Sequence, residues 1–286
     1  MAANMKAVKL RMKSIQSTMQ ITKAMELVAS SKLRRAKERA DASRPYFQTL
    51  KDTLAEIAAG NTDVSSVYTR SGKNDRWCYV VIAGDRGLAG GYNANLFKEM
   101  EAQMAGRDCA VLPIGKKAVE YYKRRRVEIL TEEFAEVGEL SVSDCFTIAK
   151  LLCRTFKSGD FGHVALGYTN FISMLSQRPG VSGMLPLADL SEDEKDVKKI
   201  RSLILYEPDA ETVFDSIVPE YLAGLIYGAI CESVASELAA RRTAMDAATK
   251  NAGEMIEQLS LYYNRARQAS ITQELSLIHI SEPTRP

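Results

Sequence analysis

The segment Gly84-Asp-Arg-Gly87-Leu-Ala-Gly90-Gly91 has residue types and a spacing that could bind a phosphate group. It follows a predicted strand and precedes a predicted helix, and glycines in such a turn can present backbone N–H groups to a phosphate. However, the spacing is neither G-x-G-x-x-G nor a loop that ends in G-K-[ST]. A tight turn from strand to helix needs glycine for its backbone geometry as well. A nucleotide-binding enzyme therefore stays open as an alternative to a purely structural turn.

The other groups that could do chemistry are few. The chain has two histidines, and His163 lies in an apolar segment where a packing role is more common than catalysis or metal binding. The five cysteines show no C-x-x-C spacing, which indicates free thiols in a reducing compartment. Carboxylate pairs such as Glu132–Glu133 stand in polar surroundings, and no G-x-S-x-G elbow occurs. We therefore expect no catalytic residue, no cofactor and no metal site.

Both ends of the chain carry an apolar heptad pattern. A seam with a period of about 3.5 residues is the signature of a coiled coil, and each end can supply a helix to the other. Small residues such as Ala29 and Ala252 would let the two backbones approach closely. The first seam passes through Met12, Ile15, Met19, Thr22, Glu26, Ala29, Leu33 and Ala36. The second passes through Met245, Ala248, Ala252, Met255, Leu259, Tyr262, Ala266 and Ala269.

Polar residues interrupt this pattern. Thr22 and Glu26 stand at seam positions of the first helix, and Arg241 does so in the second. Buried polar residues cost stability, and their best-attested use in coiled coils is to fix register or pairing. A shifted phase that exposes them explains the pattern equally well, so both interpretations stay open.

The middle of the chain alternates between strand and helix patterns. Apolar β-rich runs at 77–83, 109–114, 127–131 and 163–168 are separated by helical patterns, which predicts a small α/β layer with parallel pairing. We expect a polar linker at 60–75, a loop at 176–197 and a last strand at 200–206. The predicted fold class is α/β: a long antiparallel coiled coil of the terminal helices with a central Rossmann-like domain. The expected parts are an N-terminal helix (1–59), a central domain (75–206), a C-terminal helix (208–275) and an atypical tail (276–286).

Charge is distributed unevenly along the chain. Residues 1–50 hold 11 Lys and Arg against 3 Asp and Glu, although the whole chain has a formal net charge of +2. A basic end suits an acidic neighbour, whether nucleic acid, an anionic surface or acidic protein loops, although a solvated helix face is an equal alternative. The basic stretch lacks the interleaved aromatic residues typical of single-stranded nucleic-acid binding. No apolar run approaches 18 residues, so we expect a soluble or peripheral protein.

Four stretches resemble one known family. Ile21–Arg35 (ITKAMELVASSKLRR) closely resembles the N-terminal signature of the gamma subunit of F-type ATP synthase. Asp85–Asn93 (DRGLAGGYN) is similar to the central motif of that family. Ser236–Ala252 and Tyr263–Glu274 resemble its C-terminal signature. The matches follow the family order over residues 5–274, and the absence of a chloroplast-like insertion suggests the bacterial type.

The resemblance implies a rotor shaft that has no catalytic role of its own. In the family, the terminal helices turn inside a ring of three alpha and three beta subunits. The α/β domain lies against the epsilon subunit and the membrane-embedded c-ring. Ion flow turns the c-ring, and the shaft drives the beta subunits through their nucleotide affinities, which also regulates ATPase activity and ion flow. The resemblance thus implies a peripheral position on the cytoplasmic side of the cell membrane, with no nucleic-acid partner.

The resemblance also assigns contact residues. Lys23 and Met25 match positions close to the moving acidic region of the beta subunits. Arg267, Gln268 and Thr272 match positions that hydrogen-bond a beta-subunit loop. Two departures stand out: Ala89 replaces a cysteine or another small residue, and the sequence after Glu274 loses the heptad pattern and contains two prolines.

Overall fold

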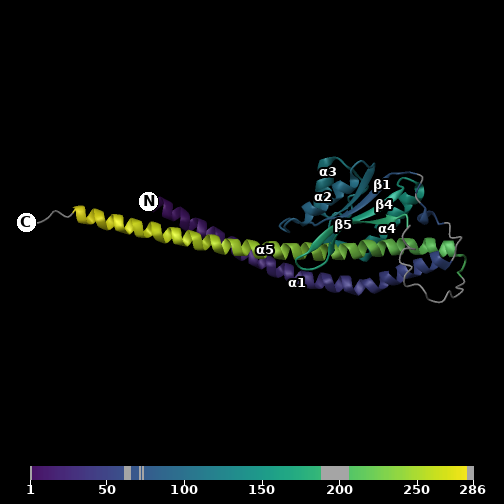
Figure 1. Ribbon diagram of the computed structural model, residues 1–286, viewed down its shortest axis with the longest axis horizontal. Coiled ribbons are helices and arrows are strands. Elements are labelled where there is room, and N and C mark those ends of the chain that lie inside the picture. The colour runs from purple at the N-terminus through teal and green to yellow at the C-terminus, as the bar shows by residue number, and fades with distance from the viewer. Residues whose placement is uncertain (1, 61–65, 71, 73, 188–205, 282–286) are drawn as a thin grey trace, which may run out of the picture. The chain divides into compact units, whose positions relative to one another are not determined.

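The computed structural model describes residues 2–60, 66–70, 72, 74–187 and 206–281 (Figure 1). The chain divides into two compact units. One, which we call the helix-pair unit, comprises Met1–Ser30 and Arg241–Pro286. The other, which we call the sheet unit, comprises Ser31–Ala240.

Two long helices contribute to both units. Helix α1 (Ala2–Gly60) has 59 residues and helix α5 (Ala210–Ser281) has 72. Each contains one internal proline, Pro45 in α1 and Pro219 in α5, and both prolines belong to the sheet unit. The C-terminal helix was expected to span 208–275 and an atypical tail to follow at 276–286, whereas α5 continues to Ser281. The rest of that tail lies outside the described residues.

In the helix-pair unit, the side chains of α1 that are shielded from solvent follow the heptad. Val8, Thr22 and Ala29 are buried. Met12, Ile15 and Met19, which share the same phase, are half-buried. Farther along α1, in the sheet unit, Leu33 and Ala36 continue the phase and are buried. The first seam is therefore in the register that the sequence predicts.

The second seam needs a correction. Met245 and Ala252 are buried and Leu259 is half-buried, but Met255 and Tyr262 are each 50% exposed. Farther along α5 the half-buried positions are Ile256, Tyr263 and Ser270 in place of Met255, Tyr262 and Ala269, while Ala248 and its neighbour Thr249 are both half-buried. The predicted and the observed seam both contain Met245, Ala252, Leu259 and Ala266. They differ at the positions in between, where the apolar Met255 and Tyr262 favoured a step of three residues before a step of four, and the structure has the reverse order.

The sheet unit contains a five-stranded sheet of order β3-β2-β1-β4-β5. Its strands are β1 (Trp77–Ile82), β2 (Cys109–Ile114), β3 (Glu128–Ile129), β4 (His163–Phe171) and β5 (Gln177–Leu185). The pairs β1–β2, β1–β4 and β2–β3 are parallel, as predicted, but β4 and β5 pair antiparallel. The prediction of a loop at 176–197 was therefore wrong for β5. Pro179 and Gly180 suggested a loop, yet proline is tolerated in an edge strand. The strand predicted at 200–206 lies almost wholly outside the described residues.

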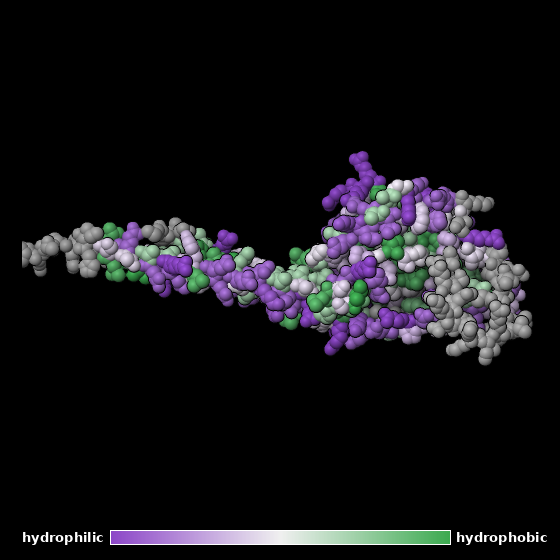
Figure 2. Space-filling view, in the orientation of Figure 1, coloured by the Kyte–Doolittle hydropathy of each residue, from purple (hydrophilic) through white to green (hydrophobic). Residues whose placement is uncertain are grey.

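The two faces of the sheet bury different cores. Cys78, Val80 and Ile82 of β1 face a core with α4 (Val142–Ser158) and the sheet-unit parts of α1 and α5. The alternate residues Tyr79 and Val81 face a smaller core under α2 (Tyr92–Met104) and α3 (Lys116–Arg125). This alternation follows from the two-residue period of a strand. Figure 2 shows mainly hydrophilic residues over the visible outer face of the unit.

The segment expected to be a linker contains packed structure. Within 60–75, Val67–Thr69 form the short 3-10 helix η1, which is capped by the Ser66 hydroxyl. Tyr68 is only 2% exposed, and its ring stacks on Phe156 of α4 at a centroid distance of 6.2 Å. A single aromatic residue in a polar run carries little periodic signal, so its burial could not be predicted from the pattern.

Part of α5 is apolar enough to cross a membrane by length and composition. However, 72% of that apolar window is buried inside the fold. The α5 residues Phe214, Val218 and Leu222 are fully buried in the larger core of the sheet unit. We therefore interpret the window as a core helix of a folded unit.

Candidate functional site in the helix pair

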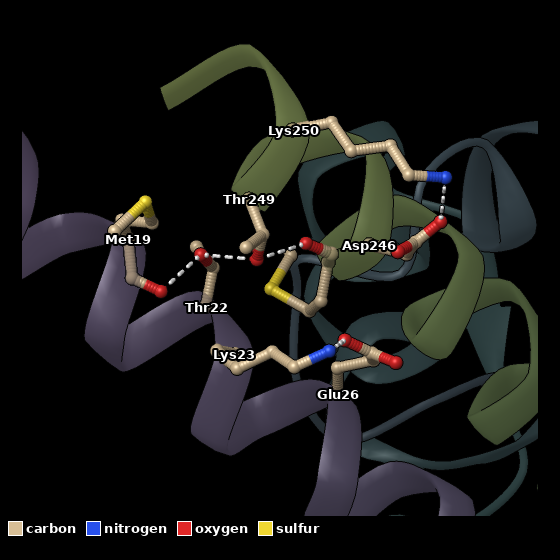
Figure 3. Close-up of polar contacts among 8 residues, drawn as sticks. Met19, Thr22, Lys23, Glu26, Asp246, Thr249 and Lys250 are labelled. Carbon is tan, nitrogen blue, oxygen red and sulfur yellow. Dashed lines mark hydrogen bonds and ion pairs between the residues drawn. The ribbon is translucent and has the colours of Figure 1, made fainter. Parts of the chain in front are cut away.

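A polar layer crosses the seam of the helix-pair unit (Figure 3). The hydroxyl oxygens of Thr22 on α1 and Thr249 on α5 lie 2.8 Å apart. Thr22 Oγ1 also lies 3.0 Å from the carbonyl oxygen of Met19, and Thr249 Oγ1 lies 2.8 Å from that of Met245. The threonine predicted to interrupt the seam is thus buried and paired across the two helices, which supports the register interpretation.

The two threonine hydroxyls have two protons to donate but make three hydrogen-bonding contacts. Each threonine hydroxyl donates one proton and can accept two hydrogen bonds. When Thr22 donates to Thr249, its bond to the Met19 carbonyl is given up, and the reverse direction frees the Met245 carbonyl instead. Because either hydroxyl can be the donor, the pair is satisfied in two equivalent arrangements. An apolar residue in place of one threonine would leave the other without its partner across the seam.

Charged residues flank the threonines. Lys23 Nζ lies 2.8 Å from Glu26 Oε2 on α1, and Lys250 Nζ lies 2.8 Å from Asp246 Oδ2 on α5. The hydrogen bond from Lys250 lowers the pKa of Asp246, and the positive charge of Lys23 lowers it further. The bond to Asp246 raises the pKa of Lys250, with a smaller effect from Glu26. Charges on α1 therefore shift the pKa values of Asp246 and Lys250 on α5, although each ion pair forms between two residues of the same helix.

The predicted contact residues form two groups in this unit. The side chain of Lys23 is 53% exposed and that of Met25 is half-buried, and both residues lie within one helical turn of Thr22. Arg267, Gln268 and Thr272 are exposed on α5. At a rise of about 1.5 Å per residue, Arg267 is about 27 Å beyond Thr249 along the helix axis. The structure therefore does not bring the two groups together, and each would meet a partner separately.

Sequence reasoning missed Thr249. The heptad phase chosen for α5 placed the neighbouring Ala248, which is half-buried, on the seam and left out Thr249, the partner of Thr22. A signal was available: Met245, Thr249 and Ala252 follow the same four-then-three spacing as Val8, Met12 and Ile15 on α1. A search for a second hydroxyl near the polar interruption would have favoured that phase.

The glycine-rich segment of the sheet unit is occupied by the chain's own groups. Gly84 N donates to Asn93 Oδ1 at 3.0 Å. The Asp85 carboxylate accepts hydrogen bonds from the backbone N–H groups of Lys116, Val137 and Gly138. A Cβ on Gly84 would lie 2.7 Å from the carboxylate of Glu237 on α5, so a larger residue there would require the Glu237 side chain to move. Two carboxylates beside this turn would repel a phosphate, which favours the structural interpretation.

The histidine and the cysteines of the sheet unit lie in environments that are typical of packing residues. The His163 ring stacks on Trp77 at a centroid distance of 4.4 Å, and its Nε2 lies 3.4 Å from an oxygen of Asp75. Four of the cysteines are buried and Cys109 is half-buried. Burial raises the pKa of Cys78 to about 12, which keeps it a thiol. Within the described residues, no group of three or more His, Cys, Asp or Glu is arranged to hold a metal ion.

Comparisons with known proteins identify the same family that the four sequence stretches resemble. A family model described as ATP synthase matches residues 4–280. An ATP synthase gamma chain from Ruminococcus albus is 46% identical over 282 residues, which cover 96% of each chain. Another from Lachnoclostridium phytofermentans is 41% identical and covers 96% of this chain and 97% of its own.

A solved structure shares the fold. It is described as Euglena gracilis mitochondrial ATP synthase, OSCP/F1/c-ring, rotational state 3. One of its chains matches 97% of this chain and 93% of its own length, with a TM-score of 0.69 and 20% identity. At that identity the likeness shows the fold alone, and the family follows from the closer relatives. This chain belongs to the ATP synthase gamma chain family.

Proposed function

We propose that this chain is the central rotor shaft of a membrane-bound F-type ATP synthase. It would couple ion-driven rotation of a c-ring to the conformational cycle of catalytic beta subunits, and the chemistry would occur on those subunits. The observation that carries the proposal is a pair of long helices with a hydroxyl pair across their seam, in a chain of the gamma family. A shaft acts by contacting each conformer of its partners differently, so it needs a fixed arrangement of unequal faces.

The proposed partners are the alpha and beta subunits, the epsilon subunit and the c-ring. Lys23 and Met25 would contact the moving acidic region of the beta subunits, and the exposed cation of Lys23 suits that charge. Arg267, Gln268 and Thr272 would bond to a beta-subunit loop, since all three are exposed and can donate. The chain would be peripheral, on the cytoplasmic side of the cell membrane, and held there through the c-ring.

The loop contact can be tested with Arg267→Ala combined with Gln268→Ala in the assembled enzyme. Losing two donors, one of them charged, should lower coupled ATP synthesis by about ten-fold or more. The matched control is Glu254→Ala with Glu257→Ala, which removes two exposed side chains from the same helix. Synthesis rate and rotational torque would be measured in proteoliposomes. Unchanged synthesis and torque in the donor variant would contradict the assignment.

The shaft proposal itself is tested by assembly. The chain should co-purify with alpha and beta subunits in constant stoichiometry, and it should restore ion-coupled ATPase activity to a complex that lacks it. A chain that folds but never enters the complex would contradict the proposal. Tight binding of ATP or NAD to the isolated chain, measured by calorimetry, would instead favour the nucleotide-binding alternative.

A further inference from the structure

The turn that joins β4 to β5 exposes apolar side chains to solvent. Ile172 is 61% exposed and Leu175 is 87% exposed, the largest value among the exposed large hydrophobic residues described. Figure 2 shows a hydrophobic patch at the tip of this hairpin, among hydrophilic residues. An isolated exposed leucine needs no explanation, but two on one tight turn indicate a surface that another molecule covers.

Hydrogen bonds hold this turn in one conformation. Ser173 Oγ accepts from the backbone N–H groups of Leu175 at 3.3 Å and Ser176 at 3.1 Å. The Gln177 side-chain amide donates to the carbonyl oxygens of Ser173 at 3.1 Å and Met174 at 3.0 Å. The apolar side chains are thus presented on an ordered backbone, which reduces the ordering cost of binding.

The hairpin is also fixed to α5. Thr169 N donates to Ser233 Oγ at 3.4 Å, and Ser236 Oγ donates to Thr169 O at 3.1 Å, both in buried positions. These bonds lie at the β4 end of the hairpin, within a few residues of the exposed tip. A force on the tip would therefore be carried to α5 inside the sheet unit.

An exposed cation, Arg178, follows the tip directly in the sequence, as the second residue of β5. On the α5 side, Glu232 is a neighbour of the Phe171 backbone, and burial raises the pKa of its carboxyl group. Arg44 Nη2 lies 4.0 Å from Glu232 and its side chain is 70% exposed. Because Arg44 pairs with Glu232, the charge that favours a carboxylate on a partner is that of Arg178.

We propose that the β4–β5 hairpin tip docks on a protein surface that combines apolar side chains with carboxylates. Leu175 and Ile172 would enter the apolar part, and Arg178 would pair with a carboxylate at its rim. This contact is distinct from those proposed for Lys23, Met25 and Arg267, which belong to the helix-pair unit. It rests on the proposed function, because the partner is a subunit of the assembled complex.

The test uses the assembled complex with Leu175 replaced by the photo-reactive residue p-benzoylphenylalanine. After illumination, the cross-linked peptide would be identified by mass spectrometry. We expect one partner segment that contains Asp or Glu beside apolar residues, and about a ten-fold lower yield when Arg178→Glu is added. The matched control carries the same probe at Leu88, which is 64% exposed elsewhere in the sheet unit. It should not label that segment.

The outcomes separate this inference from the proposed function. If the complex assembles but the probe at 175 labels no protein, labels only lipid, or labels a segment without carboxylates, the docking inference is wrong. An unchanged yield with Arg178→Glu would overturn it as well. If the unmodified chain does not assemble with the other subunits, the proposed function is wrong and the docking inference with it.

Discussion

The sheet unit and the helix-pair unit are stabilised in different ways. The sheet unit buries large side chains completely, among them Leu54, Ile57 and Phe214. The described side chains that are buried in the helix-pair unit are fewer and mostly smaller: Val8, Thr22, Ala29, Met245 and Ala252. Since hydrophobic stabilisation grows with the apolar area removed from water, most of it lies in the sheet unit.

The difference separates two requirements of the fold, overall stability and the register of the two helices. A large core tolerates many hydrophobic arrangements of similar volume, so it supplies stability more than a unique alignment. A narrow seam of small residues lets two helices come close but specifies their register weakly. A hydroxyl pair such as Thr22–Thr249 is satisfied in one register only, which makes it suited to alignment.

The largest effect is expected from the core of the sheet unit. Phe214→Ala should lower the free energy of unfolding by about 3–5 kcal/mol, because it leaves a cavity where a fully buried ring packs. Urea denaturation followed by circular dichroism would measure the change. A loss below about 1 kcal/mol would show that this core is not the main source of stability.

A medium effect is expected at the polar layer. Thr22→Val alone should cost about 0.5–1.5 kcal/mol, because the hydrogen bond across the seam is lost while the Thr249 hydroxyl can still donate to the Met245 carbonyl, and adding Thr249→Val should cost little more. A double-mutant cycle measures the coupling, and hydrogen exchange of residues 2–30 and 241–277 locates it. Additive losses in the double variant would contradict a role for the pair in alignment.

The smallest effect is expected at the charged flank. Lys23→Ala should change the free energy of unfolding by no more than about 0.5 kcal/mol, because the Lys23 side chain is half exposed and its pair with Glu26 forms within one helix. Any large effect of this variant on coupled synthesis would then reflect a contact with a partner. If thermal unfolding shifts strongly, Lys23 is instead a structural residue of the seam.

Local patterns made much of this structure predictable from the sequence. The parallel strands β1, β2 and β4 follow from short apolar runs, and the seam of α1 follows from its heptad phase. The α5 seam did not follow, because Met255 and Tyr262 are apolar in the wrong phase and only the partner helix decides between them. The edge strand β5 and the buried Tyr68 depend on tertiary contacts that no local pattern records. Of the site, Thr22 was predicted as a polar interruption, whereas its partner Thr249 was missed because the chosen phase followed the apolar Met255 and Tyr262.

The positions of the two helix prolines have a mechanical consequence. Pro45 and Pro219 each remove one rung from the backbone hydrogen-bond ladder, and both lie in segments braced by the sheet unit. Within residues 2–30 and 241–281 the described helices contain no proline, so their ladders are continuous there. The backbone ladder of each helix is therefore unbroken where the two helices have only each other for support, and each missing hydrogen bond falls where the sheet unit packs against the helix.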